Sequence, residues 1–138
     1  MNPIYYTAKE HLGEHLTLNP SVGPEEGCCE AVSYILKAAG HQLPIGGIAG
    51  VDALIAWMLQ NGFTEQSYPS IGGIVTAHSL DPSNVNFAHV GVVLKYGIGS
   101  NNSAGPMQGK FTENYSIPNW LQYFTTENGS VTRYFTCA

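Results

Sequence analysis

The chain has 138 residues, of which 43% are hydrophobic and 11% charged, and its formal net charge is −5. This length predicts a single domain over residues 1–138, and the acidic balance without any basic run excludes an ordinary nucleic-acid-binding surface. No apolar segment reaches the length of a membrane span, and the N-terminus has neither the basic nor the apolar region of a signal peptide. We therefore expect a monomer without a membrane span.

The first expected element is a helix over residues 3–18. It contains His11-Leu12-Gly13-Glu14-His15, which matches the H-x-x-E-H zinc pattern. Histidines at i and i+4 share one helix face, as two zinc ligands must. The match is short, Gly13 weakens the helix, and no downstream acidic ligand helix follows. We favour a solvated polar face, and a zinc hydrolase using His11 and His15 remains the alternative.

A second helix is expected over residues 28–40, with a cysteine in its first turn. At about 100° per residue, Cys28 falls in the middle of the apolar arc, Cys29 at its edge, and Glu30 on the opposite side. A helix N-terminus favours a thiolate, because its unpaired N–H groups and the helix dipole stabilise negative charge. A cysteine on an apolar face is nevertheless more often a packing residue than a reactive one. The apolar arc consists of Ala31, Val32, Ile35, Leu36 and Ala39, and Gly40 ends the helix.

The rest of the chain alternates short apolar segments with loops rich in glycine, proline and polar residues. These segments predict an α+β domain with most of its strands in the second half. A loop at 19–27 precedes the second helix, and a loop at 40–50, a helix at 51–61 and a connector at 63–70 follow it. The middle of the chain is expected to form a strand at 71–77, a polar loop at 78–86, a strand at 89–96, a turn at 97–99 and a strand ending in 100–103. The last part is expected to form an extended segment at 111–115, a helix at 116–124 and a strand at 131–137.

His89 opens the clearest expected strand. Gly91 lies on the same face of that strand and leaves space beside the imidazole. The chain turns back at residues 97–99, so Asn101 is expected near the end of the neighbouring strand, close to His89. A thiol nucleophile needs a base, and the base needs a polar group that orients it. Cys28, His89 and Asn101 could supply these three parts.

The chain has three cysteines, Cys28, Cys29 and Cys137. Adjacent cysteines rarely bridge each other, because the geometry is strained. A bridge from Cys137 to either of them is possible, but nothing in the sequence supports it. The odd number predicts at least one free thiol.

Four short motifs resemble the small papain-like cell-wall amidases and peptidases of the NlpC-like and CHAP-like group, in the form common among phage and prophage lysins. The resemblance covers roughly residues 20–137. One departure is Ile71-Gly72-Gly73, where the family often has Pro-Gly-Asp. The motifs are Gly27-Cys28-Cys29-Glu30-Ala31-Val32, Ile74-Val75, Ala88-His89-Val90-Gly91-Val92-Val93 and Ser100-Asn101-Asn102-Ser103, and the segment at 113–120 has the same likeness.

The resemblance implies an antiparallel sheet packed against an N-terminal helix that carries the nucleophile. It assigns Cys28 as nucleophile, His89 as base and Asn101 as the third polar residue, with Glu30 and Asn102 as substrate-binding candidates. The implied reaction is hydrolysis of an amide bond in peptidoglycan, without a metal or other cofactor. Such a protein would reside in the host cytoplasm or virion and act on the cell wall after release. A catalytically silent phage structural or wall-binding module is the other alternative.

Overall fold

The computed structural model describes residues 2–19, 27–81 and 88–137. It has an α+β fold, as the sequence predicts, with one six-stranded antiparallel sheet in the order β1-β6-β2-β3-β4-β5. Most of the expected loops at 19–27 and 78–86 lies outside the described residues. The order of the elements matches the sequence prediction except for one additional strand. Several bounds differ: the first helix and the strands expected over 71–77 and 89–96 are shorter, and the last helical segment is longer.

The elements are short, and their bounds are as follows. The helices are α1 (Pro3–Glu10), α2 (Cys28–Ala38), α3 (Val51–Gln60) and α4 (Ile117–Trp120), and α4 continues as a π-helical segment, η3 (Leu121–Glu127). The strands are β1 (Phe63–Gln66), β2 (Ile74–His78), β3 (His89–Val93), β4 (Ile98–Asn101), β5 (Phe111–Tyr115) and β6 (Val131–Cys137).

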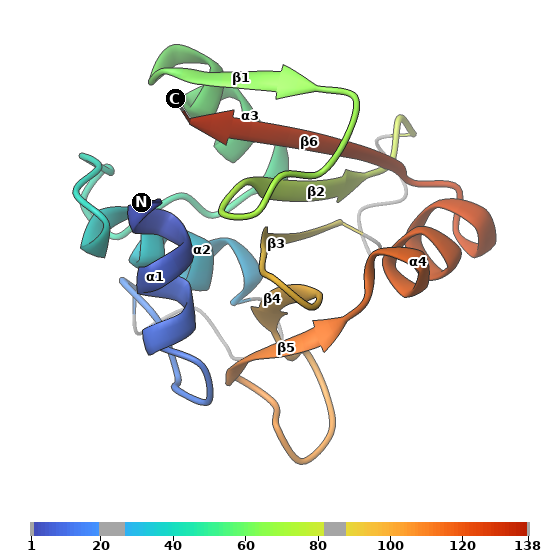
Figure 1. Ribbon diagram of the computed structural model, residues 1–138, viewed down its shortest axis with the longest axis horizontal. Coiled ribbons are helices and arrows are strands. Elements are labelled where there is room, and N and C mark those ends of the chain that lie inside the picture. The colour runs from blue at the N-terminus through green and yellow to red at the C-terminus, as the bar shows by residue number, and fades with distance from the viewer. Residues whose placement is uncertain (1, 20–26, 82–87, 138) are drawn as a thin grey trace.

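Two apolar clusters cover opposite faces of the sheet. On one face, α1, α2 and α3 pack against inward residues of β2, β3 and β6, among them Ile74, Val92 and Phe135. On the other face, α4 and η3 bring Trp120 and Phe124 against Val75, Val93 and Ile98. In Figure 1, α1 and α2 lie to one side of the middle strands and α4 to the other. This arrangement follows from the alternation of side chains along each strand, which gives the central strands two apolar faces.

Helix α2 is buried almost all round. Glu30 and Ser33, which the helical wheel assigns to a solvent-facing side, are buried as well. The segment around Leu18 covers Glu30, whose Oε2 accepts a hydrogen bond of 2.9 Å from the backbone N–H of that leucine. The loop before α3 covers Ser33, whose Oγ accepts a hydrogen bond from the N–H of Ile48. The prediction of a polar outer side is wrong for Glu30 and Ser33, because these neighbouring segments supply polar partners that the helix alone does not reveal, whereas Lys37 is exposed as predicted.

Helix α1 ends at Glu10, so the helix expected over residues 3–18 is too long. Gly13 adopts a φ of +90°, a left-handed conformation that ends the helical geometry. The chain then lies along β5: the N–H of Gly13 donates to Phe111 O at 2.7 Å, and the N–H of Phe111 donates to Glu14 O at 2.8 Å. A short bridge between His15 and Lys110 extends this pairing.

Strand β1 was expected to be part of a connector. Its residues pair with β6, from Phe63 with Cys137 to Gln66 with Tyr134. Only Phe63 of β1 is buried, so this edge strand has little of the apolar alternation that would reveal it. The expected segments 111–115 and 131–137 match β5 and β6.

The second half of the chain also contains the expected helix after Ser116. The Oγ of Ser116 accepts a hydrogen bond of 3.1 Å from the N–H of Asn119 and so caps α4. With η3, the helical segment continues to Glu127, three residues beyond the expected end. It delivers Trp120 and Phe124 to the sheet.

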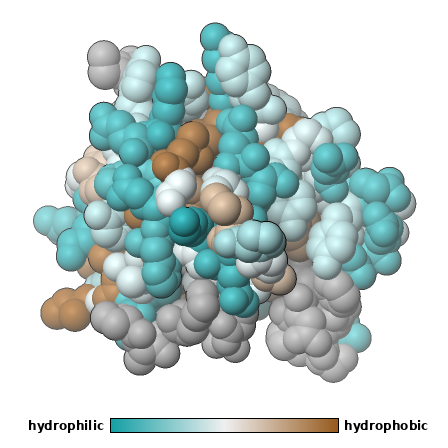
Figure 2. Space-filling view, turned by 90° about the horizontal axis from the view of Figure 1, so that it is seen from below, coloured by the Kyte–Doolittle hydropathy of each residue, from teal (hydrophilic) through white to brown (hydrophobic). Residues whose placement is uncertain are grey.

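The outer surface is mainly polar on the side shown in Figure 2, where hydrophobic residues form small separate patches. Among the described residues, no helix is long and apolar enough to cross a membrane.

Candidate active site

Cys28 is the first residue of α2, and Gly27 caps that end of the helix. The Cys28 side chain is half-buried, whereas that of Cys29 is only 3% exposed. The helical wheel pointed the other way, with Cys28 as the more inward of the two. The position that the structure gives Cys28, at a helix N-terminus and in part open to solvent, is the one that a reactive thiol needs. Cys28, Cys29 and Cys137 are all free thiols.

The electrostatics of this pair favour a thiolate on Cys28. A hydrogen bond from the Cys29 thiol is the largest influence that lowers the pKa of Cys28. Burial raises that pKa, but a hydrogen bond with His89, and the positive charge that the imidazole carries once it holds the thiol proton, lower it further, so the pKa of Cys28 stays well below the usual range of a thiol. The pKa of Cys29 is raised by the same hydrogen bond and by burial. Cys29 therefore stays protonated and acts as a donor to its neighbour.

His89 opens β3 and is 8% exposed. Its Nε2 lies 3.0 Å from Ser100 Oγ, and that hydroxyl donates a hydrogen bond of 2.6 Å to Asn114 Oδ1. Because Ser100 Oγ donates its one hydrogen to Asn114, it can only accept a hydrogen bond from His89. Nε2 of His89 therefore carries a hydrogen. The tautomer leaves Nδ1 as the nitrogen able to take a proton from the Cys28 thiol.

Gly91 explains how Ser100 reaches the imidazole. In the antiparallel register set by Val92 with Gly99, Gly91 faces Ser100. A Cβ on Gly91 would lie 2.5 Å from Ile98 Cγ2 and 3.2 Å from Ser100 Cβ. The sequence analysis expected open space beside the imidazole at this position. The structure has Ile98 and Ser100 there instead, and they fit because position 91 has no side chain.

Aromatic side chains surround the rest of the imidazole. Phe124 stacks on His89 with ring centroids 5.5 Å apart and an interplanar angle of 17°. Trp120 lies at 5.5 Å and Tyr115 at 6.0 Å. Such packing fixes the plane of the ring and limits the water around it. The sequence predicted the helix that carries Trp120 but did not connect it with His89.

Asn101 ends β4 on the face opposite to Ser100, and it is 3% exposed. Its side chain lies against the N-terminus of α2, where a Cβ on Gly27 would meet Asn101 Nδ2 at 3.4 Å. The structure thus brings Asn101 next to the residue that precedes Cys28, while the partner of His89 Nε2 is Ser100. The role of Asn101 as the third catalytic residue stays a prediction.

Asn102 belongs to the polar network behind Ser100. Its Nδ2 donates to Lys110 O at 2.8 Å and to Thr112 Oγ1 at 2.7 Å, and its Oδ1 accepts from Asn114 Nδ2 at 3.1 Å. These bonds hold the side chain against β5. Its expected role in substrate binding stays a prediction.

Glu30 is 1% exposed and takes part in the interior of the domain. One carboxylate oxygen accepts the hydrogen bond from Leu18, and the other, Oε1, has no hydrogen-bond partner among the residues that the structure describes. A Cβ on Gly47, whose φ is +78°, would lie 3.2 Å from Oε1, so the glycine lets the loop before α3 close over the carboxylate. These contacts favour a structural role for Glu30 over its expected role in substrate binding.

His11 and His15 do not share a helix face, because α1 ends before them. His11 Nδ1 lies 3.1 Å from Glu14 Oε1, and His15 pairs with Lys110 beside β5. Among residues 2–19, 27–81 and 88–137, no three His, Cys, Asp or Glu side chains are grouped as metal ligands. The helical geometry on which the zinc alternative depends is therefore missing.

Sequence reasoning missed Ser100, Asn114 and Phe124 as neighbours of the imidazole. Ser100 stands in the motif that suggested Asn101, and only the strand register decides which of the two faces His89. Asn114 and Phe124 come from distant segments that carry no catalytic signature. The available signal was that Ser100 and Asn102 are two residues apart, so their side chains lie on the same face of a strand, whereas the side chain of Asn101 lies on the other.

No family model matches this chain, and no curated protein matches it at a significant level. Two solved structures are similar. One is the native type VI effector–immunity complex Tae3–Tai3 from Ralstonia pickettii, with a TM-score of 0.61 and 12% identity, covering 100% of both chains. The other is Ly7917 with the hydrolyzing product of MDP, with a TM-score of 0.57 and 19% identity, covering 99% of this chain and 62% of that one. At these identities the likeness describes the fold.

Proposed function

We propose that this protein is a papain-like cysteine amidase or peptidase that hydrolyses an amide bond in peptidoglycan. The single observation that carries the proposal is the placement of Cys28 at the N-terminus of α2 beside His89, an imidazole that lowers the pKa of the thiol and whose Nε2 is held by Ser100. A thiol at a helix N-terminus beside an oriented imidazole is the arrangement required for nucleophilic attack on a carbonyl.

The proposed reaction has two steps. Cys28 gives its proton to His89 Nδ1, and the thiolate forms a bond to the amide carbonyl carbon. The N–H groups of the first turn of α2 stabilise the oxyanion, and the C–N bond breaks as the imidazolium protonates the leaving amine. Water, deprotonated by His89, then attacks the thioester, which releases a carboxylic acid and returns the thiol. No metal or organic cofactor enters either step.

Two residues compete for the role of the third group. The contact with Nε2 favours Ser100, which holds the tautomer and is itself held by Asn114. Asn101, the residue proposed from the sequence, lies against Gly27 and could support the position of the Cys28 turn. We propose that Ser100 orients the imidazole and that Asn101 positions the nucleophile.

The choice of substrate rests on two kinds of support. The motifs around Cys28 and His89 resemble cell-wall amidases and peptidases, and one structure with a similar fold holds the hydrolysis product of MDP, a muramyl dipeptide. The other similar structure is that of a bacterial effector with its immunity protein. Both kinds of support point to the wall polymer, and neither distinguishes the muramoyl–alanine bond from a bond within the stem peptide.

The proposal is tested by the decrease in turbidity of purified sacculi in three parallel reactions. We expect the untreated protein to clear the suspension, iodoacetamide to abolish clearing, and a chelator to leave it unchanged. Loss of clearing with chelator alone would favour the zinc alternative. Absence of clearing in all three reactions, by a protein whose circular dichroism is that of a folded α+β domain, would favour the silent binding module.

A further inference from the structure

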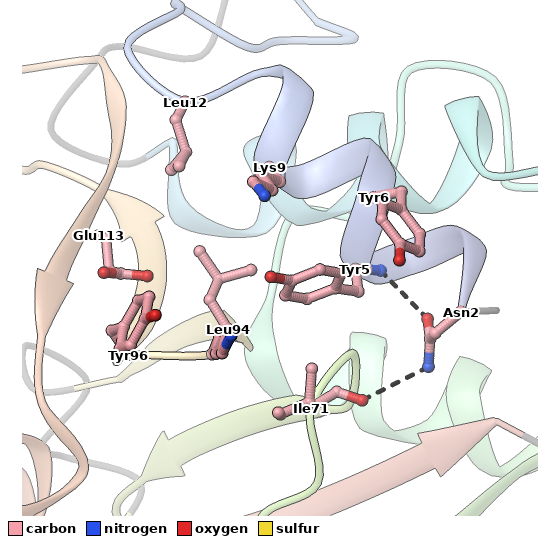
Figure 3. A pocket seen from close by; sticks show the side chains of 10 residues that line it. Asn2, Tyr5, Tyr6, Lys9, Leu12, Ile71, Leu94, Tyr96 and Glu113 are labelled. Atoms are coloured by element: carbon pink, nitrogen blue, oxygen red, sulfur yellow. Dashed lines mark hydrogen bonds between the residues drawn. The ribbon is translucent and has the colours of Figure 1, made fainter.

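A concave site lies away from Cys28. It is a pocket of about 660 Å³ between α1 and the turn that joins β3 to β4. Figure 3 shows Tyr5, Lys9 and Leu12 of the N-terminal segment on one side, and Leu94 and Tyr96 on the other. We call this site the tyrosine groove. It also includes Asn2, Tyr6, Ile71, Lys95 and Glu113.

The tyrosine groove is separate from the reaction centre. His89 begins β3, and Leu94 follows the last residue of that strand. At about 3.3 Å per residue, the five intervening steps place the two ends roughly 17 Å apart. A small ligand in the groove would therefore not touch the catalytic pair, but a polymer long enough to span this distance could occupy both places.

The walls of the groove are held together before any ligand binds. Asn2 Oδ1 accepts a hydrogen bond of 3.1 Å from the N–H of Tyr5, and Asn2 Nδ2 lies 3.5 Å from the carbonyl of Ile71, as Figure 3 shows. These contacts tie the start of α1 to the loop before β2. A pocket of several hundred Å³ with fixed walls is of the size that binds small ligands or sugar units.

The chemistry of the groove combines aromatic rings with positive charge. Tyr6 and Tyr96 are both exposed, and Tyr96 is 80% exposed. Lys95 Nζ lies 5.4 Å from the centre of the Tyr96 ring, which keeps the ammonium at the rim. Only five Lys or Arg occur in the chain, and two of them, Lys9 and Lys95, line this groove. Within the described ranges, neither lysine forms an ion pair with a carboxylate.

We infer that the tyrosine groove binds glycan strands of peptidoglycan from which stem peptides have been removed, through the muramic-acid carboxylates that this removal leaves free. Tyrosine faces pack against the apolar C–H faces of sugar rings, and the two unpaired lysines supply charge for a carboxylate in an otherwise acidic protein. Asn2 and Glu113 offer hydrogen-bonding groups for hydroxyls. This inference rests on the proposed function for the identity of the polymer, but the binding itself does not require catalysis.

The test is a titration of the full chain, followed by amide chemical shifts, with two sugars of equal size. One is the disaccharide of N-acetylglucosamine and N-acetylmuramic acid, whose lactyl carboxylate is free, and the other is neutral chitobiose. We expect the acidic disaccharide to shift the amides of residues 94–96 and of α1, and to bind at least tenfold more tightly than chitobiose. Equal affinities, shifts confined to the surroundings of Cys28, or no binding would overturn the inference.

Matched variants assign the effect to the groove. Lys95→Gln and Tyr96→Ala should each weaken binding of the acidic disaccharide about tenfold, whereas Lys37→Gln and Tyr68→Ala, which alter exposed residues elsewhere, should not. Unchanged binding by both groove variants would also overturn the inference. Cleavage of sacculi is measured separately: cleavage without groove binding contradicts the inference alone, and groove binding without cleavage contradicts the proposed function alone.

Discussion

His89 Nε2 and Ser100 Oγ lie 3.0 Å apart across the β3–β4 pair, on the face where Gly91 has no side chain to come between them. The hydroxyl passes its own hydrogen bond on to Asn114 at 2.6 Å. This contact fixes one tautomer of the imidazole. It also means that experiment must decide whether Ser100 or Asn101 is the third catalytic residue.

The first prediction separates Ser100 from Asn101. If Ser100 holds the tautomer, Ser100→Ala should lower turnover roughly ten- to a thousandfold, because each 1.4 kcal/mol or so of lost transition-state stabilisation is about tenfold in rate. Ser100→Thr, which keeps the hydroxyl, should retain more activity. Asn101→Ala should have the smaller effect. The measurement is turnover on purified sacculi, with thermal unfolding as the folding control.

The reverse order would favour the sequence prediction: a crippled Asn101→Ala with near-normal Ser100→Ala makes Asn101 the third catalytic residue. Asn102→Ala should act mainly through its network with Thr112 and Asn114, so we expect a loss smaller than that of Ser100→Ala. Asn119→Ala, in an exposed position of α4, is the matched control.

The second prediction concerns the pH dependence of alkylation. Because the pKa of Cys28 is lowered and that of Cys29 is raised, iodoacetamide should label Cys28 selectively at pH values where ordinary thiols react slowly. In His89→Ala, the loss of the imidazole hydrogen bond and charge should move the labelling of Cys28 to higher pH. Peptide mass mapping after timed labelling provides the measurement. Preferential labelling of Cys29 would contradict the assignment of the nucleophile.

The third prediction concerns Cys29. Its thiol donates the hydrogen bond that most lowers the pKa of Cys28, but it does not enter the proposed chemistry. Cys29→Ala should therefore retain most of its activity at high pH, while the acidic limb of the pH–rate profile shifts to higher pH. Cys28→Ala should be inactive at every pH and still folded. A Cys29→Ala variant that is inactive throughout would show that the wrong cysteine has been chosen.

The fourth prediction concerns stability. Glu30→Ala removes the acceptor for the N–H of Leu18 and leaves a cavity beneath Gly47. We expect a loss of roughly 2–4 kcal/mol in the free energy of unfolding, measured by urea denaturation. Glu30→Gln keeps an oxygen for Leu18 and should lose less. Glu10→Ala, at the exposed end of α1, should change stability very little, and a similar loss there would contradict the buried role of Glu30.

The fifth prediction concerns the histidines after α1. His15 pairs with Lys110 beside β5, and the helix face required for two zinc ligands is absent. His15→Ala should therefore leave turnover within about twofold of the unaltered protein. Metal analysis of the purified protein is the accompanying measurement. Stoichiometric zinc that disappears together with activity in His15→Ala would restore the zinc alternative.

Much of the fold could be predicted because its signals are local. The apolar repeat of α2 and the left-handed Gly40 that follows its end at Ala38, the alternation in β3, and the cap at Ser116 each depend on neighbouring residues. The errors arose where segments far apart in the sequence determine the local structure. β1 exists because β6 pairs with it, and α1 is short because residues after Gly13 pair with β5 instead.

The candidate site likewise combines features that local sequence predicts with features that distant segments determine. The sequence proposes Cys28 and His89 from the chemistry of their residue types and from their positions at the starts of a helix and a strand. It proposes Asn101 as the third residue and does not point to Ser100, because a shift of one residue in strand register exchanges the two faces. The burial of Glu30 and the stacking of Phe124 on His89 depend on elements far apart in the chain.

The measurement that tests the central claim most directly is mass spectrometry of muropeptides released from purified sacculi by the unaltered protein and by Cys28→Ala. The proposed hydrolysis predicts new products that arise by cleavage of one amide bond, each pair summing to its parent plus one water, and their absence with Cys28→Ala. Products with intact amide bonds, or identical amide cleavage by Cys28→Ala, would contradict a Cys28-dependent peptidoglycan amidase or peptidase.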